Sequence, residues 1–195
     1  MKSAILIFVR PPEPGKVKTR LATGIGAEKA LQVYIFLLKH TAGLVSSLGI
    51  PLFVFYAGDV VTDDMFTGTQ VTKLQQGEGD LGERMDAAFT EVFSRGFGQA
   101  VIIGSDCYEL TSDIILEGLS LLQQTDLVIG PARDGGYYLL GMNQPVKSVF
   151  DAIAWSSQTV FRDTVARAAR ENCSVSLLPV LTDVDKAEDI SFSYA

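Results

Sequence analysis

Ala4-Ile-Leu-Ile-Phe-Val9 is a continuous apolar run that leads directly into the basic, proline-rich segment Arg10-Pro-Pro-Glu-Pro-Gly-Lys-Val-Lys-Thr-Arg20. An apolar run without polar alternation is typical of a strand that is buried on both faces of a sheet. Similar runs recur at 52–57, 100–104, 127–130 and 137–140, and a further strand is expected near 71–74. The pattern therefore predicts a sheet with helices on both faces.

Helical patterns alternate with these strands. Apolar residues share one helical face within 31–45, 85–93 and 161–168. A further helix is expected over about 113–123, with Thr111 or Ser112 as its N-cap, and Ser156 is the expected N-cap of the last helix. This alternation predicts an α/β fold, a three-layer α/β/α sandwich with a mostly parallel sheet, in a single domain over residues 1–195. The link between 130 and 137 is too short for a parallel crossover, so one strand is expected to run antiparallel.

Composition excludes several classes of protein. The chain has 195 residues, 47% of them hydrophobic, and a formal net charge of −7, so it can form a core and is not a disordered segment. An acidic protein is a poor candidate for sequence-independent binding of nucleic acid. No apolar run reaches the length of a transmembrane helix, and Cys107 and Cys173 form no disulfide framework, so the expected compartment is the cytoplasm.

The segment after the first strand is the strongest candidate for binding phosphate. Four cations, Arg10, Lys16, Lys18 and Arg20, fall within 11 residues of an acidic chain. Arginine can donate two hydrogen bonds to a phosphate, and lysine supplies a point charge. The structural alternative is a solvated basic turn. The segment is not a P-loop, because the Walker A pattern is absent.

The segment after the third strand, Gly77-Glu-Gly-Asp-Leu-Gly82, matches Gly-x-Gly-x-x-Gly. A dinucleotide site is disfavoured, because the motif lies outside the first βα unit and its two acids would face a pyrophosphate with like charge. We expect instead a loop over a base or sugar. The structural alternative is a helix entry capped by Asp80 and Glu83.

Three aspartates follow other strands. Asp106, in Gly104-Ser-Asp106, and Asp185, in Asp183-Val-Asp185, are candidate metal ligands, since Mg²⁺ takes one or two carboxylates together with substrate phosphates. Asp134 precedes two glycines that allow close approach of a ligand, and it is a candidate contact of a sugar or acceptor. The structural alternatives are turns and helix caps.

His40 is the only histidine, and it falls within a predicted helix, far along the chain from these loops. Histidine-based triads and histidine-rich zinc sites are therefore not expected. With no histidine nearby, Cys107 is expected to be a small buried hydrophobe rather than a nucleophile.

These segments, taken in order, resemble a known family. Residues 10–21 resemble the signature of the bacterial radical-SAM/selenodomain-associated transferases of type 1, within the nucleotide-diphospho-sugar transferase superfamily of GT-A fold. Residues 79–85, 104–106, 130–137 and 183–185 resemble its other blocks. The chain is also similar, more distantly, to phospholactate guanylyltransferases. Two positions depart from the family pattern, both beside the predicted metal ligands: Tyr108 replaces a usual proline and Lys186 a common threonine.

The resemblance implies a site for a nucleotide or nucleotide sugar, a divalent cation (Mg²⁺ or Mn²⁺) and a small-molecule acceptor. Phosphates would meet the basic segment, the metal would bind Asp106 and Asp185, and Asp134 would be the catalytic base. The residues that bind the nucleotide and its phosphates would be Arg10, Lys16, Lys18, Arg20, Gly79, Gly82 and Arg84. The residues near the acceptor or sugar would be Gly135, Gly136 and Tyr137.

Glycosyl transfer from a nucleotide sugar is the reaction that the resemblance favours. The alternatives are nucleotidyl transfer from a nucleoside triphosphate, as in guanylyltransferases, and a nucleotide-binding module without turnover. In both transfers negative charge grows on phosphate oxygens, and fixed cations and a metal ion stabilise that charge.

Overall fold

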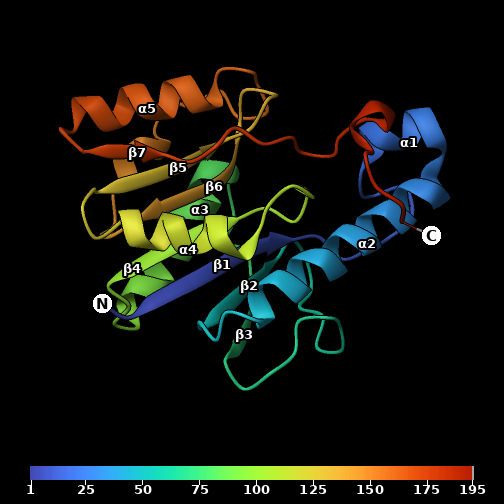
Figure 1. Ribbon diagram of the computed structural model, residues 1–195, viewed down its shortest axis with the longest axis horizontal. Helices are drawn as coiled ribbons and strands as arrows, with labels where there is room; N and C mark the ends of the chain where they lie inside the picture. Colours follow the sequence, from blue (N-terminus) through green and yellow to red (C-terminus); the bar gives the residue numbers. More distant parts are fainter. Residues whose placement is uncertain (195) are drawn as a thin grey trace.

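The computed structural model describes residues 1–194 and contains a seven-stranded sheet between two layers of helices (Figure 1). The expected α/β/α sandwich is therefore confirmed. The strands are β1 (Ser3–Val9), β2 (Leu52–Tyr56), β3 (Val71–Gln75), β4 (Gln99–Ile103), β5 (Leu127–Pro131), β6 (Tyr137–Met142) and β7 (Val175–Leu177).

The order of strands across the sheet is β3-β2-β1-β4-β6-β5-β7. β6 runs antiparallel to both of its neighbours, as the short glycine-rich link predicts, and the other pairs are parallel. From β1 the chain builds the sheet outward through β2 and β3, and it then returns to β4 on the other side. In sheets of this kind, ligands bind beyond the carboxyl ends of the strands at such a switch point.

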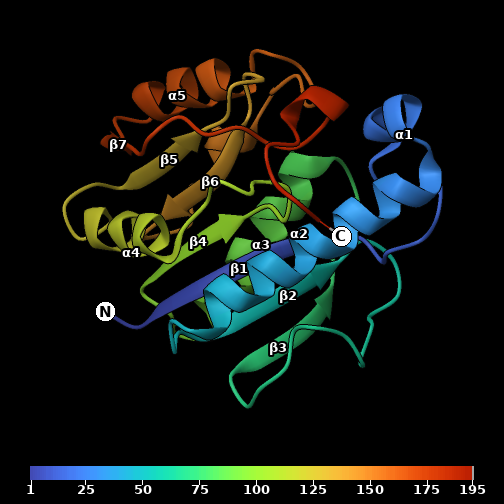
Figure 2. The same ribbon diagram turned by 45° about the vertical axis from the view of Figure 1, so that its right-hand side comes forward.

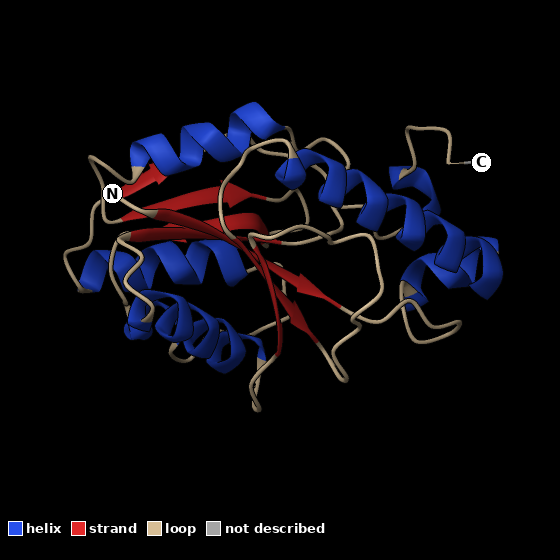
Figure 3. Ribbon diagram, turned by 90° about the horizontal axis from the view of Figure 1, so that it is seen from below, coloured by secondary structure: helices blue, strands red, loops and turns tan. Residues whose placement is uncertain are grey.

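Helices cover both faces of the sheet (Figure 3). Alternate residues of β1 point to opposite faces, so that Ile5 packs in the core beneath α2 and α4, while Leu6 packs in the core beneath α3 and α5. The helices are α1 (Thr19–Ile25), α2 (Ala27–Ser46), α3 (Leu81–Ser94), α4 (Ser112–Leu121) and α5 (Val160–Arg170), with short 3-10 turns η1 (Lys147–Phe150) and η2 (Ala187–Asp189).

A smaller core lies outside the sandwich. Leu21 of α1, Leu37 of α2 and Val184 of the C-terminal segment pack together there, each nearly fully buried. Figure 1 shows the C-terminal segment running back from β7 to α1, where η2 lies. This contact brings residues near both ends of the chain to the carboxyl edge of the sheet.

The caps of two helices follow the sequence, and one does not. Thr111 accepts a hydrogen bond from the Ile114 N–H at 3.3 Å and caps α4 as expected. Asp80 accepts from the Glu83 N–H at 2.9 Å in a capping box at the start of α3. The prediction that Ser156 is the N-cap of α5 is wrong. The N-cap of α5 is Thr159, and Ser156, three residues earlier, has a positive φ of 64°.

The basic segment is also shorter as a loop than the sequence indicates, because its last residues, Thr19 and Arg20, form the first turn of α1. Gly26, with a φ of 88°, separates α1 from α2. Within residues 1–194, no helix is both long and apolar enough to cross a bilayer.

Candidate functional site

A cleft of about 1190 Å³ lies beyond the carboxyl ends of the strands, at the switch point between β1 and β4. Figure 2 shows the parallel strands, such as β1 and β2, directed toward this edge, where α1 and the C-terminal segment lie. The walls come from the loops after β1, β3 and β4, the β5–β6 turn, the segment 155–158 and the segment 182–189. Each segment singled out in the sequence therefore contributes at least one residue to a single cleft.

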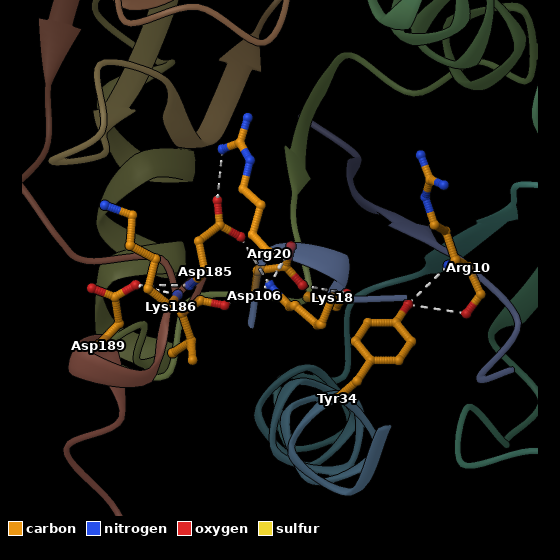
Figure 4. Close-up of polar contacts among 10 residues, drawn as sticks. Arg10, Lys18, Arg20, Tyr34, Asp106, Asp185, Lys186 and Asp189 are labelled. Atoms are coloured by element: carbon orange, nitrogen blue, oxygen red, sulfur yellow. Dashed lines mark hydrogen bonds and ion pairs between the residues drawn. The ribbon is translucent and has the colours of Figure 1, made fainter. Parts of the chain in front are cut away.

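Lys18 is the best-buried cation of the cleft, with a side chain only 5% exposed. Its Nζ lies 2.9 Å from Asp106 Oδ2 and 3.4 Å from Asp185 Oδ1, and it donates to the Val184 carbonyl oxygen at 2.7 Å (Figure 4). Lys18 is the N-cap residue of α1 and has a left-handed backbone, with φ at 48°. The stretches 16–20, 104–106 and 182–189 therefore meet at one ammonium group.

The surrounding acids keep Lys18 charged. Burial by itself lowers the pKa of the amine, but the negative charges of Asp106, Asp185 and Asp183 outweigh burial, and the net pKa of Lys18 is raised. Lys18 is therefore an ammonium ion throughout the neutral range.

Asp183 is a further acid of the cleft that the site predicted from the sequence did not include. Burial, together with the negative charges of Asp106 and Asp134, raises the pKa of Asp183 to about 7, although Lys18 opposes the shift. Asp183 and Asp185 flank the buried Val184 and both line the cleft. The Asp-x-Asp spacing was the available signal for Asp183.

The other predicted cations lie further out. Arg20 Nη1 is 3.5 Å from Asp185 Oδ2, and the Arg20 side chain is 66% exposed at the rim. Lys16 is exposed and pairs with Glu13. Arg10 lines the cleft, and its backbone N–H and carbonyl both bond to the Tyr34 hydroxyl, at 2.9 and 3.0 Å (Figure 4). The basic segment therefore presents one inward-facing cation and three more accessible ones.

Hydrogen bonds order the segment that carries Asp185. Asp189 Oδ2 accepts from the backbone N–H of Asp185 at 2.9 Å and of Lys186 at 2.7 Å. The Val184 N–H donates to the Asp106 carbonyl oxygen at 2.9 Å, which ties this segment to the loop after β4. The capping role considered for this region is therefore fulfilled by Asp189, and both Asp106 and Asp185 keep carboxylates that face the cleft.

At the two departures from the family pattern, the side chains contact groups other than the predicted metal carboxylates. The Tyr108 ring packs against Phe192 at 4.1 Å, His40 at 4.7 Å and Phe36 at 5.8 Å between centroids, in the aromatic contact under the C-terminal segment. Lys186 pairs with Glu188 at 3.6 Å and is largely exposed. His40 packs on Tyr108 and does not line the cleft.

Cys107 is 3% exposed, and burial raises the pKa of its thiol, which agrees with its expected role as a small hydrophobe.

The β5–β6 turn contributes Asp134, Gly136 and Tyr137 to the cleft. Asp134 Oδ1 accepts from the Gly136 N–H at 2.9 Å, so the Asp-Gly turn and the cleft-lining carboxylate are the same feature. Arg84, on α3, lines the cleft and donates to Gln76 Oε1 at 3.2 Å. Asp134 and Lys18 thus line the same cleft.

Three of the predicted glycines, Gly79, Gly82 and Gly135, lie outside the cleft lining, and the last two pack against residues that line it. A Cβ on Gly82 would lie 2.5 Å from Trp155 Cζ2, and one on Gly135 would collide with the Gln158 carbonyl oxygen. Trp155, the only tryptophan of the sequence, lines the cleft and was missed, because no motif marks its segment.

The donors suit a divalent cation only in part. Among residues 1–194, no group of three or more His, Cys, Asp or Glu side chains could hold a metal ion. Asp106 and Asp185 do face a common point, and two carboxylates completed by phosphate oxygens and water form a normal Mg²⁺ environment. At present that point is taken by the Lys18 ammonium.

Residues 41–157 match a family described as "Uncharacterized protein conserved in bacteria (DUF2064)". The chain is similar to a protein of Desulfovibrio desulfuricans G20 whose crystal structure was described as that of a candidate nucleotide-diphospho-sugar transferase. The two share 36% identity and a TM-score of 0.88 over 95% of this chain and 83% of that one. The motif-based resemblance is thereby confirmed at the level of the superfamily.

More distant structures share the fold. A 4-diphosphocytidyl-2C-methyl-D-erythritol synthase of Anaerococcus prevotii is 10% identical, with a TM-score of 0.62 over 96% of this chain and 92% of that one. Rv0371c of Mycobacterium tuberculosis, solved in complex with manganese, is 14% identical, with a TM-score of 0.57 over 97% and 95%. No curated protein matches the chain.

Proposed function

The chain belongs to the DUF2064 family, and from this membership and the fold we propose that it is a metal-dependent transferase that uses a nucleotide sugar as donor. The 36% identical structure from Desulfovibrio desulfuricans supports the nucleotide-sugar class, since it was described as a candidate transferase of that kind. The reaction we favour is glycosyl transfer to a small-molecule acceptor.

The convergence of charged residues in one cleft is the observation that carries this proposal. A diphosphate brings negative charge to a protein whose own net charge is −7, so it needs a local group of cations. Lys18 and Arg20 supply that group beside Asp106 and Asp185, at the edge of the sheet where nucleotides bind in related architectures.

Different residues of the cleft would carry out different parts of this reaction. Arg20, exposed at the rim, would donate to phosphate oxygens, and Asp106 and Asp185 would hold Mg²⁺ or Mn²⁺. The metal, when bound, would neutralise charge that develops on the leaving phosphate. Gly136 and Tyr137 also line the cleft, and the sugar or acceptor would lie beside them.

Asp134, in the same β5–β6 turn, would be the base. The acceptor oxygen forms a bond to the anomeric carbon while the bond from that carbon to the phosphate oxygen breaks, and the acceptor proton passes to the Asp134 carboxylate. The nucleoside diphosphate leaves with the bonding electron pair. The hydrogen bond from Gly136 orients the Asp134 side chain for this role.

The test is a panel of nucleoside diphosphates, nucleoside triphosphates and nucleotide sugars, with and without Mg²⁺ or Mn²⁺. Trp155 lines the cleft and is the only tryptophan, so ligand binding should change its fluorescence. At a ligand concentration about 100 times Kd, binding stabilises the fold by about 2.7 kcal/mol, which a thermal melt resolves. No response to any nucleotide with either metal would refute the proposal.

Products separate the chemistries. Mass spectrometry of an incubated reaction should find a nucleoside diphosphate and a glycosylated acceptor. Pyrophosphate released from a nucleoside triphosphate would instead show nucleotidyl transfer in the same cleft. Tight nucleotide binding with no product, across a broad set of acceptors, would favour a binding module.

Asp106→Asn tests the metal within this scheme. The variant should keep the metal-free response to nucleotides and lose most of the gain that metal provides, because it removes one of two carboxylate ligands. Asp113→Asn is the control, since Asp113 is an exposed aspartate in the first turn of α4, outside the cleft. If both variants respond to metal as the wild type does, Asp106 is not a ligand.

A further inference from the structure

We propose that Lys18 is an internal counter-ion of Asp106 and Asp185. A divalent cation then binds these two carboxylates only when a phosphate ligand replaces them as the partner of the Lys18 ammonium. The inference rests on the proposed function, because it concerns the same metal and phosphate. It predicts an exchange of partners. Without ligand, Lys18 pairs with the two carboxylates; with ligand, Lys18 pairs with phosphate and the carboxylates hold the metal ion.

The hydrogen bonds of Lys18 are already complete. An ammonium group has three N–H donors and no acceptor. The Lys18 Nζ has three acceptors, the Val184 carbonyl oxygen at 2.7 Å, Asp106 Oδ2 at 2.9 Å and Asp185 Oδ1 at 3.4 Å. No N–H remains for a phosphate oxygen, so Lys18 can bind phosphate only by releasing one of these partners. The Asp185 contact is the longest of the three.

The position of the ammonium is built into the fold. The side chain is 5% exposed, against 66% for Arg20 two residues later. The backbone of Lys18 is left-handed, a conformation that a non-glycine residue adopts at a cost and keeps only where surrounding contacts enforce it. Val184 is 1% exposed and bonds through its N–H to the Asp106 carbonyl oxygen, so the acceptors of Lys18 are held together as well.

A metal ion and the Lys18 ammonium cannot share this position. Asp106 and Asp185 would hold a divalent cation close to the Lys18 ammonium that they now bind, where like charges repel strongly in a partly buried site. A diphosphate provides replacement acceptors for the ammonium and further oxygens for the metal. Metal and phosphate ligand therefore promote each other's binding, and this coupling is reciprocal.

The first test is a Mn²⁺ titration of nucleotide-free protein, in which the electron paramagnetic resonance signal measures the concentration of free Mn²⁺. Lys18→Met should bind Mn²⁺ at least about tenfold more tightly than the wild type, because the carboxylates lose their internal cation. The control is Lys73→Met. Lys73 is also poorly exposed, at 15%, and pairs with Asp64 at 2.7 Å outside the cleft, so its loss should leave Mn²⁺ affinity unchanged. Unchanged or weaker binding by a folded Lys18→Met variant overturns the inference.

A second test does not depend on the folding of Lys18→Met. Asp106→Asn, made in the protein that retains Lys18, should bind Mn²⁺ without nucleotide with an affinity within about twofold of the wild type, since Lys18 already pairs with Asp106 and Asp185. A loss of about tenfold or more from this substitution would mean that the empty site is ready for metal, and the inference would fail.

These measurements separate the two proposals. Both titrations are made without nucleotide, so they report on Lys18 whether or not a nucleotide sugar is the donor. If no nucleotide changes the Trp155 fluorescence, the proposed function is refuted, but the conclusion from the Mn²⁺ titrations is unaffected. A nucleotide response with metal, but no gain of Mn²⁺ affinity in Lys18→Met, would remove the inference alone.

Discussion

Gly82→Ala is the substitution that most directly tests how the cleft wall is built. Gly82 is a buried residue in the first turn of α3, where alanine would normally favour the helix by about 1 kcal/mol. An added Cβ would lie 2.5 Å from Trp155 Cζ2 and 2.8 Å from Cε2. Carbon atoms in ordinary contact are about 3.5–4.0 Å apart, so the indole must move by roughly 1 Å.

The expected cost follows from these two effects. Overpacking of a tight contact costs about 1–3 kcal/mol, which exceeds the gain in helix propensity. The net destabilisation should therefore reach up to about 2 kcal/mol, and for a chain of this size each kcal/mol lowers the melting temperature by about 2–4 °C. Because Trp155 lines the cleft, its displacement should also weaken nucleotide binding.

The assay is thermal denaturation together with the tryptophan emission spectrum, which reports on Trp155 alone. Gly43→Ala is the matched control, because Gly43 is also helical, in α2, and an added Cβ there meets nothing within 4 Å. Gly43→Ala should raise the melting temperature by about 2–4 °C and leave the emission unchanged. If Gly82→Ala is stabilised equally and keeps the wild-type emission, Trp155 does not pack on α3 as described.

Three further predictions concern charge and reactivity. Arg20→Ala should weaken diphosphate binding by about 1.5–3 kcal/mol, measured by fluorescence titration, and unchanged affinity would remove this residue from the phosphate site. In the folded protein a thiol reagent should label the partly exposed Cys173 and spare Cys107, which mass spectrometry of digested protein checks and equal labelling contradicts. Hydrogen bonds from Ser174 lower the pKa of Asp126 below its ordinary 3.8, so their contribution to stability is present above pH 3.8 and is lost as the pH falls through the native pKa. Melting temperatures of wild type and Asp126→Ala should accordingly differ at neutral pH and converge in acid, and a constant gap would contradict this.

Strands and the loops that follow them were predictable because their signals are local. An apolar run such as Ala4–Val9 needs burial on both faces wherever it is placed, and alternation with helices then indicates the layers. The antiparallel β6 followed from the length of a link, and the cap of α4 from a single threonine. These features depend on a few consecutive residues.

Other features depended on residues far apart in the chain. Ser156 reads as a helix cap, but its neighbours Trp155 and Gln158 pack against Gly82 and Gly135, and Ser156 itself has a left-handed backbone. Four cations of one basic segment look equivalent in sequence, and only the return of the C-terminal segment to α1 turns Lys18 inward. The tertiary contact, rather than residue type, distinguishes it from Lys16.

The sequence alone determined a mostly parallel sheet covered by helices, with charged loops at the strand ends, because the apolar runs and the alternation of strands with helices require that arrangement. Which charges touch was decided only by the tertiary structure, since Lys18 and Asp185 are separated by most of the chain and meet through packing of the buried Val184. A buried ammonium needs acceptors on every side, and only distant segments folded together can provide them.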